Sequence, residues 1–335
     1  MKHLLEPMKA GGLSLKNRLV MPPMATNKAE ADGAVSPGIL DYYGDKTQSG
    51  LLGLVITEHH FVSPGGQAHP NQLSAADDAK LDGLKALADV IHRGGSPAVI
   101  QINHAGGMAS SKLTGREPLA PSAVHIPRKR DGALPRELAK AEIASIVGDF
   151  AAAARRARDA GFDGVEIHAA HGFLLQQFYT PLINKRKDEY GGSVENRIRV
   201  ILEIVAAIQS DIGKDFPVLV RLGAFDYMDG GVSLDDVTVA ARAFEEAGVC
   251  VLDISGGQNG FEIPGGDGQP GYFAPLTLAA KKDSRIPVIL TGGINHLEEA
   301  EQLLKEGKGD LIGVGRALMK DSKWVEKEFA GFGES

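Results

Sequence analysis

The chain has 335 residues, of which 43% are hydrophobic and 24% are charged, and its formal net charge is -7. This composition excludes a disordered or low-complexity chain, because it supplies enough apolar side chains for one large core. The acidic balance argues against nucleic acid or an anionic membrane as a bulk partner. Cys250 is the only cysteine, which excludes an internal disulfide and an iron–sulfur cluster held by cysteines.

The N-terminus lacks the long apolar segment of a signal peptide, and no apolar stretch approaches the ~20 residues of a membrane span. The sequence therefore predicts a soluble, cytoplasmic protein with no membrane partner. Basic residues gather between Lys112 and Lys140, and Arg128 to Arg130 are the densest group. Because Pro127, Asp131 and Gly132 flank this group, we expect a solvated loop.

Short apolar runs alternate with amphipathic segments along the whole chain. Such runs are typical of strands buried in a parallel sheet, and the segments between them are typical of helices that cover it. Eight strands with intervening helices predict an α/β protein, a single (β/α)8 TIM barrel over residues 1–335. A doubly wound open sheet is the alternative, because periodicity does not report closure. The predicted strands are Leu19–Met21, Leu54–Ile56, Ala98–Ile102, Val165–Ile167, Val218–Val220, Val251–Ile254, Val288–Leu290 and Leu311–Val314. The predicted helices are Lys80–Arg93, Lys140–Asp159, Glu195–Ile212, Leu234–Ala247 and Leu297–Lys305.

A degenerate repeat supports the barrel. Gly161, Gly248 and Gly307 each follow a predicted helix and precede a predicted strand. A glycine in this position can end the helix with a positive φ. We expect these turns at the N-terminal end of the barrel, and the polar residues that follow each strand at the C-terminal rim, where barrels carry their chemistry.

Two long segments lack clear periodicity. Residues 106–138 are rich in Pro, Gly and Ser, and a loop of this length is usually functional or an ordered insertion. We expect an inserted rim loop or hairpin that acts as a lid. Residues 256–275, which include the glycine-rich stretch 265–268, are a second candidate wall that we expect to be flexible.

Two histidines follow the apolar run Val165–Ile167. His168 comes directly after the run, and His171 lies beside the turn former Gly172. Imidazoles three residues apart suit a pair of hydrogen-bond donors for an anionic or carbonyl ligand. Two alternatives stay open, a metal pair and histidines of the core, although no third and fourth metal ligands are evident.

Glycines follow the seventh and eighth predicted strands. Gly292 and Gly293 come after the seventh strand, and Gly315 with Arg316 comes after the eighth. Loops in these positions form the usual phosphate site of barrels, and a guanidinium can donate two hydrogen bonds to phosphate. The alternative is that the glycines only turn the chain. A dinucleotide fingerprint of the G-x-G-x-x-G type is absent.

Two further polar residues lie at strand ends. Arg221 ends the run Val218–Val220 and would direct a permanent cation toward the barrel mouth, unless it forms a structural salt bridge. Gln101 lies within an apolar strand, where its amide needs partners. A phosphate site, a cation, an amide and two imidazoles together suit a phosphorylated heteroaromatic ligand, and flavin mononucleotide (FMN) fits each of them.

The motifs of the chain resemble those of the old yellow enzyme family of FMN-dependent NAD(P)H oxidoreductases over nearly the whole length. The matching segments are Asn17–Met24, Gln101–Gly106, Glu166–Gly172, Phe178–Arg186, Asp188–Arg197, Val220–Arg221, Thr291–Gly293 and Gly315–Arg316. The resemblance implies a barrel that binds FMN and takes hydride from NADH or NADPH. It also implies a small-molecule substrate and allows a homo-oligomer.

The resemblance implies a role for each matching residue. His168 and His171 would be catalytic, donating hydrogen bonds to the carbonyl oxygen of an α,β-unsaturated substrate in a ping-pong cycle. No residue is expected to bind a metal. The residues expected to bind FMN are Pro22, Pro23, Met24, Ala25, the backbone at His59, Gln101, Arg221, Gly292, Gly293, Gly315 and Arg316.

The chain departs from the family pattern at Phe173, where many members carry a tyrosine that protonates the substrate. Tyr179, Tyr227 and Tyr272 are candidate replacements, or water supplies the proton. Two other functions therefore stay open beside reduction of a C=C bond. One is a flavin-dependent amine dehydrogenase or carbonyl desaturase, and the other is a slow-turnover redox sensor or electron-transfer protein.

Overall fold

Eight parallel strands close into a barrel. The computed structural model describes residues 2–129, 132–264 and 269–332. Around the barrel the order is β3-β4-β6-β9-β10-β11-β12-β13, and β13 pairs again with β3. The prediction of a TIM barrel is confirmed, and the open-sheet alternative is wrong. The barrel strands are β3 (Leu19–Met21), β4 (Leu54–Ile56), β6 (Ala98–Asn103), β9 (Gly164–Ala169), β10 (Val218–Gly223), β11 (Val251–Ser255), β12 (Val288–Leu290) and β13 (Leu311–Gly313).

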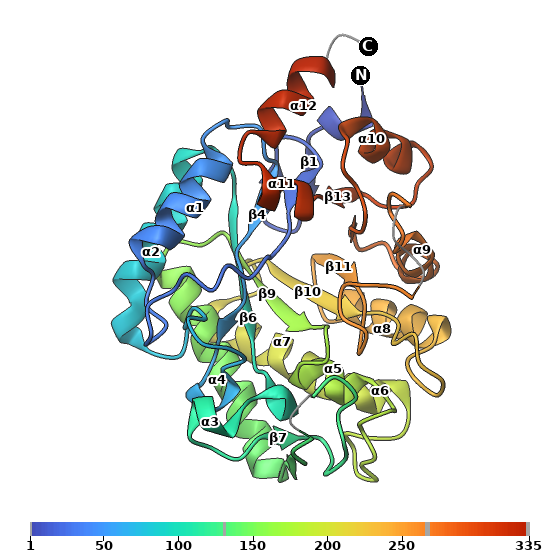
Figure 1. The fold of residues 1–335 in the computed structure, drawn as a ribbon. Coiled ribbons are helices and arrows are strands. Elements are labelled where there is room, and N and C mark those ends of the chain that lie inside the picture. The colour runs from blue at the N-terminus through green and yellow to red at the C-terminus, as the bar shows by residue number, and fades with distance from the viewer. Residues whose placement is uncertain (1, 130–131, 265–268, 333–335) are drawn as a thin grey trace.

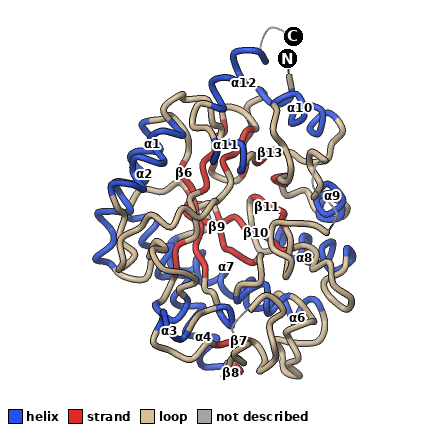
Figure 2. Tube along the Cα trace, viewed as in Figure 1, coloured by secondary structure: helices blue, strands red, loops and turns tan. Residues whose placement is uncertain are grey.

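Helices surround the strands, as Figures 1 and 2 show. The predicted helix over residues 195–212 is interrupted at Ile198, so it forms two helices. The other four predicted helices are present with bounds that shift by at most one residue. The helices are α1 (Pro37–Thr47), α2 (Leu81–Arg93), α3 (Ser111–Thr114), α4 (Lys140–Asp159), α5 (Leu174–Tyr179), α6 (Val194–Arg197), α7 (Arg199–Ile212), α8 (Leu234–Glu246), α9 (Ala274–Lys281), α10 (Leu297–Lys305), α11 (Arg316–Lys320) and α12 (Trp324–Phe332). Among the helices of these three ranges, none combines the length and apolar character needed to cross a bilayer.

Side chains along each barrel strand alternate between the helices and the barrel interior. The interior core holds residues such as Val99, Leu219 and Val251, and the hairpin of β1 (Met8–Ala10) and β2 (Leu13–Leu15) packs against it. Two residues closer to the carboxyl end of each strand, the interior positions of the neighbouring strands β6, β9, β10 and β11 are polar. These buried residues are Gln101, Glu166, Arg221 and Asp253.

The glycine turns are confirmed. Gly161, Gly248 and Gly307 adopt φ of +88°, +87° and +69°. The backbone N–H of each donates to a carbonyl of the preceding helix at 2.9 Å. A residue with a Cβ is strained at such φ values, so these glycines end their helices and return the chain to the next strand.

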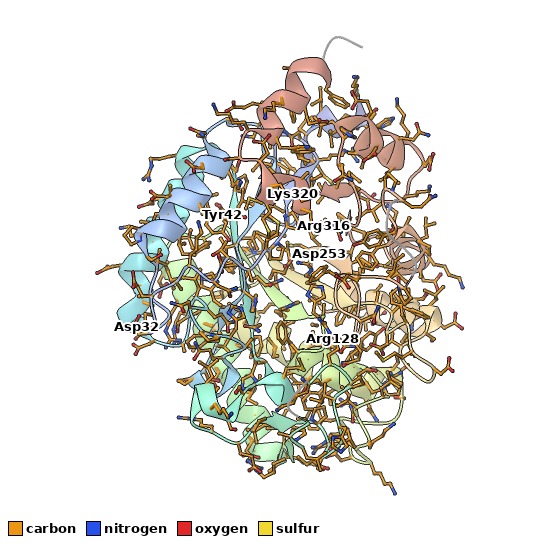
Figure 3. All side chains as sticks on the ribbon, viewed as in Figure 1. Asp32, Tyr42, Arg128, Asp253, Arg316 and Lys320 are labelled. Atoms are coloured by element: carbon orange, nitrogen blue, oxygen red, sulfur yellow. The ribbon has the colours of Figure 1, made fainter. Side chains whose placement is uncertain are left out.

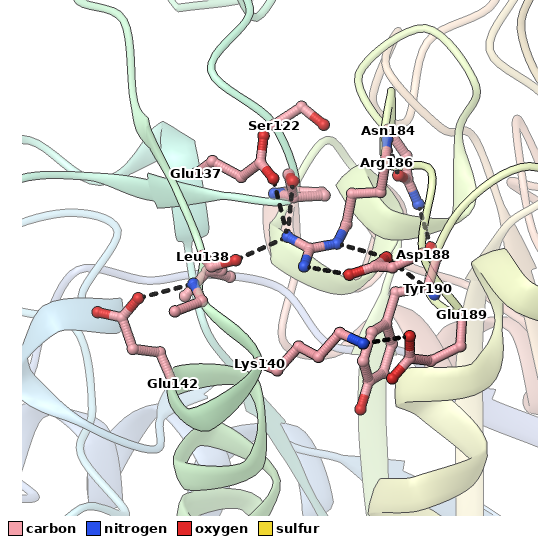
Figure 4. A network of polar contacts seen from close by, with 12 residues as sticks. Ser122, Glu137, Leu138, Lys140, Glu142, Asn184, Arg186, Asp188, Glu189 and Tyr190 are labelled. Atoms are coloured by element: carbon pink, nitrogen blue, oxygen red, sulfur yellow. Dashed lines mark hydrogen bonds and ion pairs between the residues drawn. The ribbon is translucent and has the colours of Figure 1, made fainter.

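The described residues of the predicted insertion, 106–129 and 132–138, do not form a hairpin of β7 (Leu119–Ala120) and β8 (Arg136–Glu137), because these two short strands pair parallel. Arg186, which follows α5, anchors it (Figure 4). The guanidinium donates to the Leu138 and Pro121 carbonyls at 2.7 and 3.1 Å, and it pairs with Asp188 at 2.6 Å. The flexibility expected for residues 256–275 stays a prediction, and residues 265–268 of this loop lie outside the described residues.

Candidate functional site

A cavity of about 550 Å³ opens at the carboxyl ends of the barrel strands. Ligand sites of barrels form at this end, and cavities of roughly 300–1,000 Å³ suit small molecules and cofactors. Every residue that the sequence predicted for the site lines this one cavity. These residues are Pro22, Pro23, Met24, Ala25, His59, Gln101, His168, His171, Arg221, Gly292, Gly293, Gly315 and Arg316.

Two of the lining residues are anchored from within the barrel. Gln101 Nε2 donates to Glu166 Oε1 at 2.8 Å, and Arg221 Nε lies 3.2 Å from Asp253 Oδ2. Arg221 Nη1 also donates to the Pro23 carbonyl at 3.3 Å. The Gln101 amide and the Arg221 guanidinium therefore hold fixed orientations at the cavity floor, and each keeps N–H groups for a ligand.

The two predicted catalytic imidazoles are neighbours, with ring centroids 5.0 Å apart and planes at 79°. His168 lies within β9, one residue before the strand ends at Ala169. His171 adopts φ of +58°, a left-handed conformation that costs a non-glycine residue about 1–3 kcal/mol. His171 Nε2 lies 2.7 Å from Ser255 Oγ, and the last residue of β11 thereby fixes the ring.

Both imidazoles are neutral at pH 7. Burial first, and then the nearby imidazoles and Arg221, lower the pKa of His168 well below its usual value. Burial, Arg221 and Arg128 lower the pKa of His171 in the same direction. A neutral imidazole carries one N–H, so each ring can donate one hydrogen bond. His168 Nδ1 is buried without a hydrogen-bond partner in the described part of the chain.

A third imidazole extends the wall. His59 lies 6.0 Å from His168 and 5.4 Å from Phe173, measured between ring centroids. Gln72 Nε2 donates to His59 Nδ1 at 2.9 Å, which places the ring proton on Nε2. Burial and His69 lower the pKa of His59 to about 3. Only the backbone of His59 was expected at the site from the sequence, and the contacts of its ring were not.

The predicted phosphate residues lie together at another part of the cavity. Gly292 and Gly293 adopt φ of +105° and +69° and pass close to the Tyr272 ring. The Tyr272 hydroxyl donates to the Phe261 carbonyl at 2.7 Å, and Arg316 Nη2 lies 3.5 Å from it. Backbone without side chains beside an exposed guanidinium is chemistry that fits a phosphate group.

Several lining residues were not among those predicted for the site. Arg128, Phe261 and Met108 lie at the cavity, and Arg128 Nη1 donates to the His171 carbonyl at 3.5 Å. Figure 3 shows Arg128 and Arg316 on opposite sides of Asp253 in that view. Arg128 is exposed in a loop, as expected for the basic group, and it also lines the cavity, which the sequence did not predict. Arg130, in the same basic group, lies outside the described residues.

The candidate proton donors separate clearly. Tyr272 lines the cavity, whereas Tyr179 and Tyr227 are absent from its lining. Tyr179 is fully buried. Phe173 lines the cavity at the position of the family tyrosine, and its ring centroid lies 5.2 Å from that of His168. The described residues contain no group of three or more His, Cys, Asp or Glu side chains that could hold a metal ion.

Residues 3–332 match the profile of the NADH:flavin oxidoreductase / NADH oxidase family. The chain belongs to this family. The structure is similar to the solved structure of the old yellow enzyme homologue from Zymomonas mobilis, with a TM-score of 0.85 and 29% sequence identity. That match covers 98% of this chain and 92% of the other. The family resemblance expected from the motifs is therefore confirmed.

Curated relatives from this family differ in length. The chain is 40% identical to the NADH oxidase of Thermoanaerobacter brockii, over 98% of this chain and 51% of that protein. It is 37% identical to the NADPH dehydrogenase of Geobacillus thermodenitrificans, over 96% of this chain and 92% of that protein. The chain thus spans about half the length of some curated relatives that it matches and nearly the whole of others.

Proposed function

We propose that this chain is an FMN-dependent NAD(P)H oxidoreductase that reduces an activated C=C bond, the α,β-unsaturated bond of a carbonyl compound. The observation that carries the proposal is the cavity itself. It brings together an amide and a guanidinium on its floor, two neutral imidazoles on its wall and a glycine-rich turn beside Arg316. Names of relatives such as NADH oxidase and NADPH dehydrogenase support a nicotinamide hydride donor.

The cavity residues suit FMN. Gln101 and Arg221 would hold the polar edge of the ring, because both lie at the cavity floor and keep N–H groups for a ligand. Gly292, Gly293, Gly315 and Arg316 would hold the phosphate, and Pro22 to Ala25 with His59 would line the ring. When bound, FMN accepts a hydride from one substrate and passes it to another.

His168 and His171 would then bind the substrate carbonyl. Two neutral N–H donors at the oxygen stabilise the negative charge that develops there when the C=C bond is reduced. Neutral donors suit this role, since they keep their protons and leave another group to protonate the substrate at Cα. By analogy with other such donors, the loss of one costs about 10²–10³ in rate.

A slow-turnover redox protein is the second candidate, and Phe173 is the observation that favours it. Its ring packs against His168 and His59 where a hydroxyl would help to protonate the substrate. Tyr272 does line the cavity, but its hydroxyl donates to the Phe261 carbonyl near Arg316. A redox sensor would need the flavin site without that general acid, whose contribution is typically 10²–10⁴ in rate.

Three further points belong to the proposal. Residues 1–335 would form one FMN-binding domain, the protein would work in the cytoplasm, and its substrate would be a small molecule. A homo-oligomer also stays a prediction.

One experiment tests the proposal. Purified protein is examined by visible spectroscopy and then titrated without oxygen, first with NADH or NADPH and afterwards with cyclohexenone. We expect a flavin spectrum that the nicotinamide bleaches and the enone restores. Colourless protein that FMN cannot reconstitute would contradict the whole proposal. Reduction by amines in place of NAD(P)H would favour the dehydrogenase alternative, and flavin that the enone fails to reoxidise would favour the redox protein.

A further inference from the structure

Two carboxylates are enclosed in the barrel directly behind the cavity floor. Glu166 on β9 and Asp253 on β11 have no exposed surface. Arg221 lies on the strand between them, and in the sheet register it is the partner of Asp253 on one side and of His168 on the other. Gln101 on β6 is the register partner of Glu166. The four side chains form the polar layer of the barrel interior.

The layer contains two acids and only one permanent cation. Arg221 lies within 3.2 Å of Asp253, while Glu166 receives its hydrogen bond from the neutral Gln101. One Glu166 oxygen and both Asp253 oxygens have no hydrogen-bond donor among the described residues. An ionised carboxylate without donors is costly to bury, and it commonly binds a proton instead.

Among the described residues, the surroundings of the layer offer no other buried charge to balance the second carboxylate. The remaining barrel strands β3, β4, β12 and β13 contain only apolar residues and one glycine. The hairpin on the opposite side contributes Ala10, Leu13 and Leu15 to the interior core. Toward the cavity, the imidazoles of His168, His171 and His59 are neutral. The other titratable residues of the cavity lining are Tyr272 and the exposed Arg128 and Arg316.

We propose that Glu166 and Asp253 share one proton, and that the pair binds a second proton when negative charge is added beside Arg221. The pair would thus be a proton reservoir beneath the cofactor. This inference rests on the proposed function, because the added charge is that of the flavin on two-electron reduction. In balance, the flavin receives two electrons and one proton, either as hydride from the nicotinamide donor or as electrons from a chemical reductant together with a proton from solvent. One further proton from solvent enters the pair.

The electrostatics of the pair support this assignment. Burial and the charge of Asp253 raise the pKa of Glu166 well above its usual value. Burial raises the pKa of Asp253 to about 6, against the opposing effect of Arg221. Two interacting acids titrate as a unit. Both shifts favour the protonated form of the pair, and a further negative charge beside Arg221 raises its affinity for a second proton.

Glu166 and Asp253 are positioning residues, since they reach the cavity only through Gln101 and Arg221. The reservoir neutralises charge that would otherwise remain buried, so it makes reduction of the cofactor less costly at low pH. A purely structural role would orient the same two side chains but would bind no extra proton. Proton counting therefore separates the two roles.

The test counts the total protons bound per two electrons when the flavin-loaded protein is reduced between pH 6 and pH 8, from the pH dependence of the midpoint potential. We expect wild-type protein to take up more than one proton per two electrons, and Glu166→Gln and Asp253→Asn to take up about one. Both amides keep an acceptor for Gln101 or Arg221. Glu58→Gln is the matched control, because Glu58 is also a buried carboxyl with a raised pKa of about 7 but lies outside the barrel layer. Uptake of only one proton by wild type, or unchanged uptake in both variants, overturns the proposal.

A second measurement does not depend on the flavin. The infrared spectrum of the purified protein at pH 7 should contain a band from protonated carboxyl groups. Glu166→Gln should remove the part of this band that comes from the pair, and that part should remain in Glu58→Gln. If no such band is lost in Glu166→Gln, the shared proton does not exist, whether or not the protein reduces enones. Normal flavin binding and enone turnover with this result would leave the proposed function intact and reject only the reservoir.

Discussion

His171 Nε2 lies 2.7 Å from Ser255 Oγ, so the last residue of β11 holds an imidazole of the loop that follows β9. Ser255→Ala removes this contact and frees the ring to rotate. A hydrogen bond of this kind contributes about 0.5–1.5 kcal/mol, so we expect enone turnover, as kcat/KM, to fall about two- to tenfold. Steady-state kinetics with cyclohexenone would measure it. Ser96→Ala is the control, since Ser96 is equally buried but bonds the Leu52 carbonyl away from the cavity. An equal loss in both variants would refute the assignment.

The neutrality of the imidazole pair gives a pH prediction. Histidine in a peptide binds a proton near pH 6.5, whereas burial and neighbouring groups lower the pKa of His168 and His171. A lowered pKa means that the neutral ring persists as the pH falls through 6.5. We expect ¹⁵N NMR to show both rings neutral from pH 7.5 to pH 5.5, with signals assigned from His168→Gln and His171→Gln. A ring that binds a proton near pH 6.5 would contradict this.

The rim of the site was predictable because parallel strands in a barrel end on the same side. Gln101 lies near the end of an apolar run, and His168 and Arg221 directly follow apolar runs. These positions are enough to predict that the three residues lie at one rim. The helix α5 was missed because all six of its residues are buried, which leaves no amphipathic period. The helix α1 was also missed, although Ser36 caps it and Pro37 begins it, a recognised start pattern.

The contacts of most residues that support the site could not be predicted from the sequence, because they depend on tertiary structure. Glu166 and Asp253 are the exceptions. Ser255 follows a predicted strand and was expected at the rim, but its contact with His171 spans 84 positions of sequence. The contact of Arg128 with His171 spans 43 positions, so no local pattern identifies either contact. Glu166 and Asp253 did leave a local trace. Each is an acid between two apolar strand residues, in the alternation that also sends Arg221 inward. An acidic residue inside a predicted barrel strand therefore indicates a buried carboxyl in the barrel interior.

Phe173 offers a test of the missing proton donor. Phe173→Tyr adds a hydroxyl to a ring that already lines the cavity beside His168. General-acid help is typically worth 10²–10⁴ in rate where protonation is slow, so we expect faster reoxidation of the reduced protein by enones. Reduction by NAD(P)H should be unchanged. Stopped-flow measurement of the two half-reactions separates them, and unchanged reoxidation would show that protonation is not the slow step.

Gly292 tests the phosphate site. Its φ is +105°, and a Cβ there would lie 2.7 Å from the Tyr272 ring. Gly292→Ala therefore adds both backbone strain and a clash beside Arg316. We expect FMN to bind at least about tenfold more weakly, a loss of about 1.4 kcal/mol, when dissociation is followed by flavin fluorescence.

Gly307→Ala separates strain from the clash. Gly307 also has a positive φ, +69°, but a Cβ there meets nothing within 4 Å. Gly307→Ala should lose about 1–2 kcal/mol of unfolding free energy, because a left-handed residue with a Cβ costs that much. Gly292→Ala should lose at least as much, because of the added clash, and urea titration of flavin-free protein measures both. Only Gly292→Ala should also lose affinity for FMN. If Gly307→Ala weakens FMN equally, the loss reflects stability alone, and the glycine turn after β12 does not hold the phosphate.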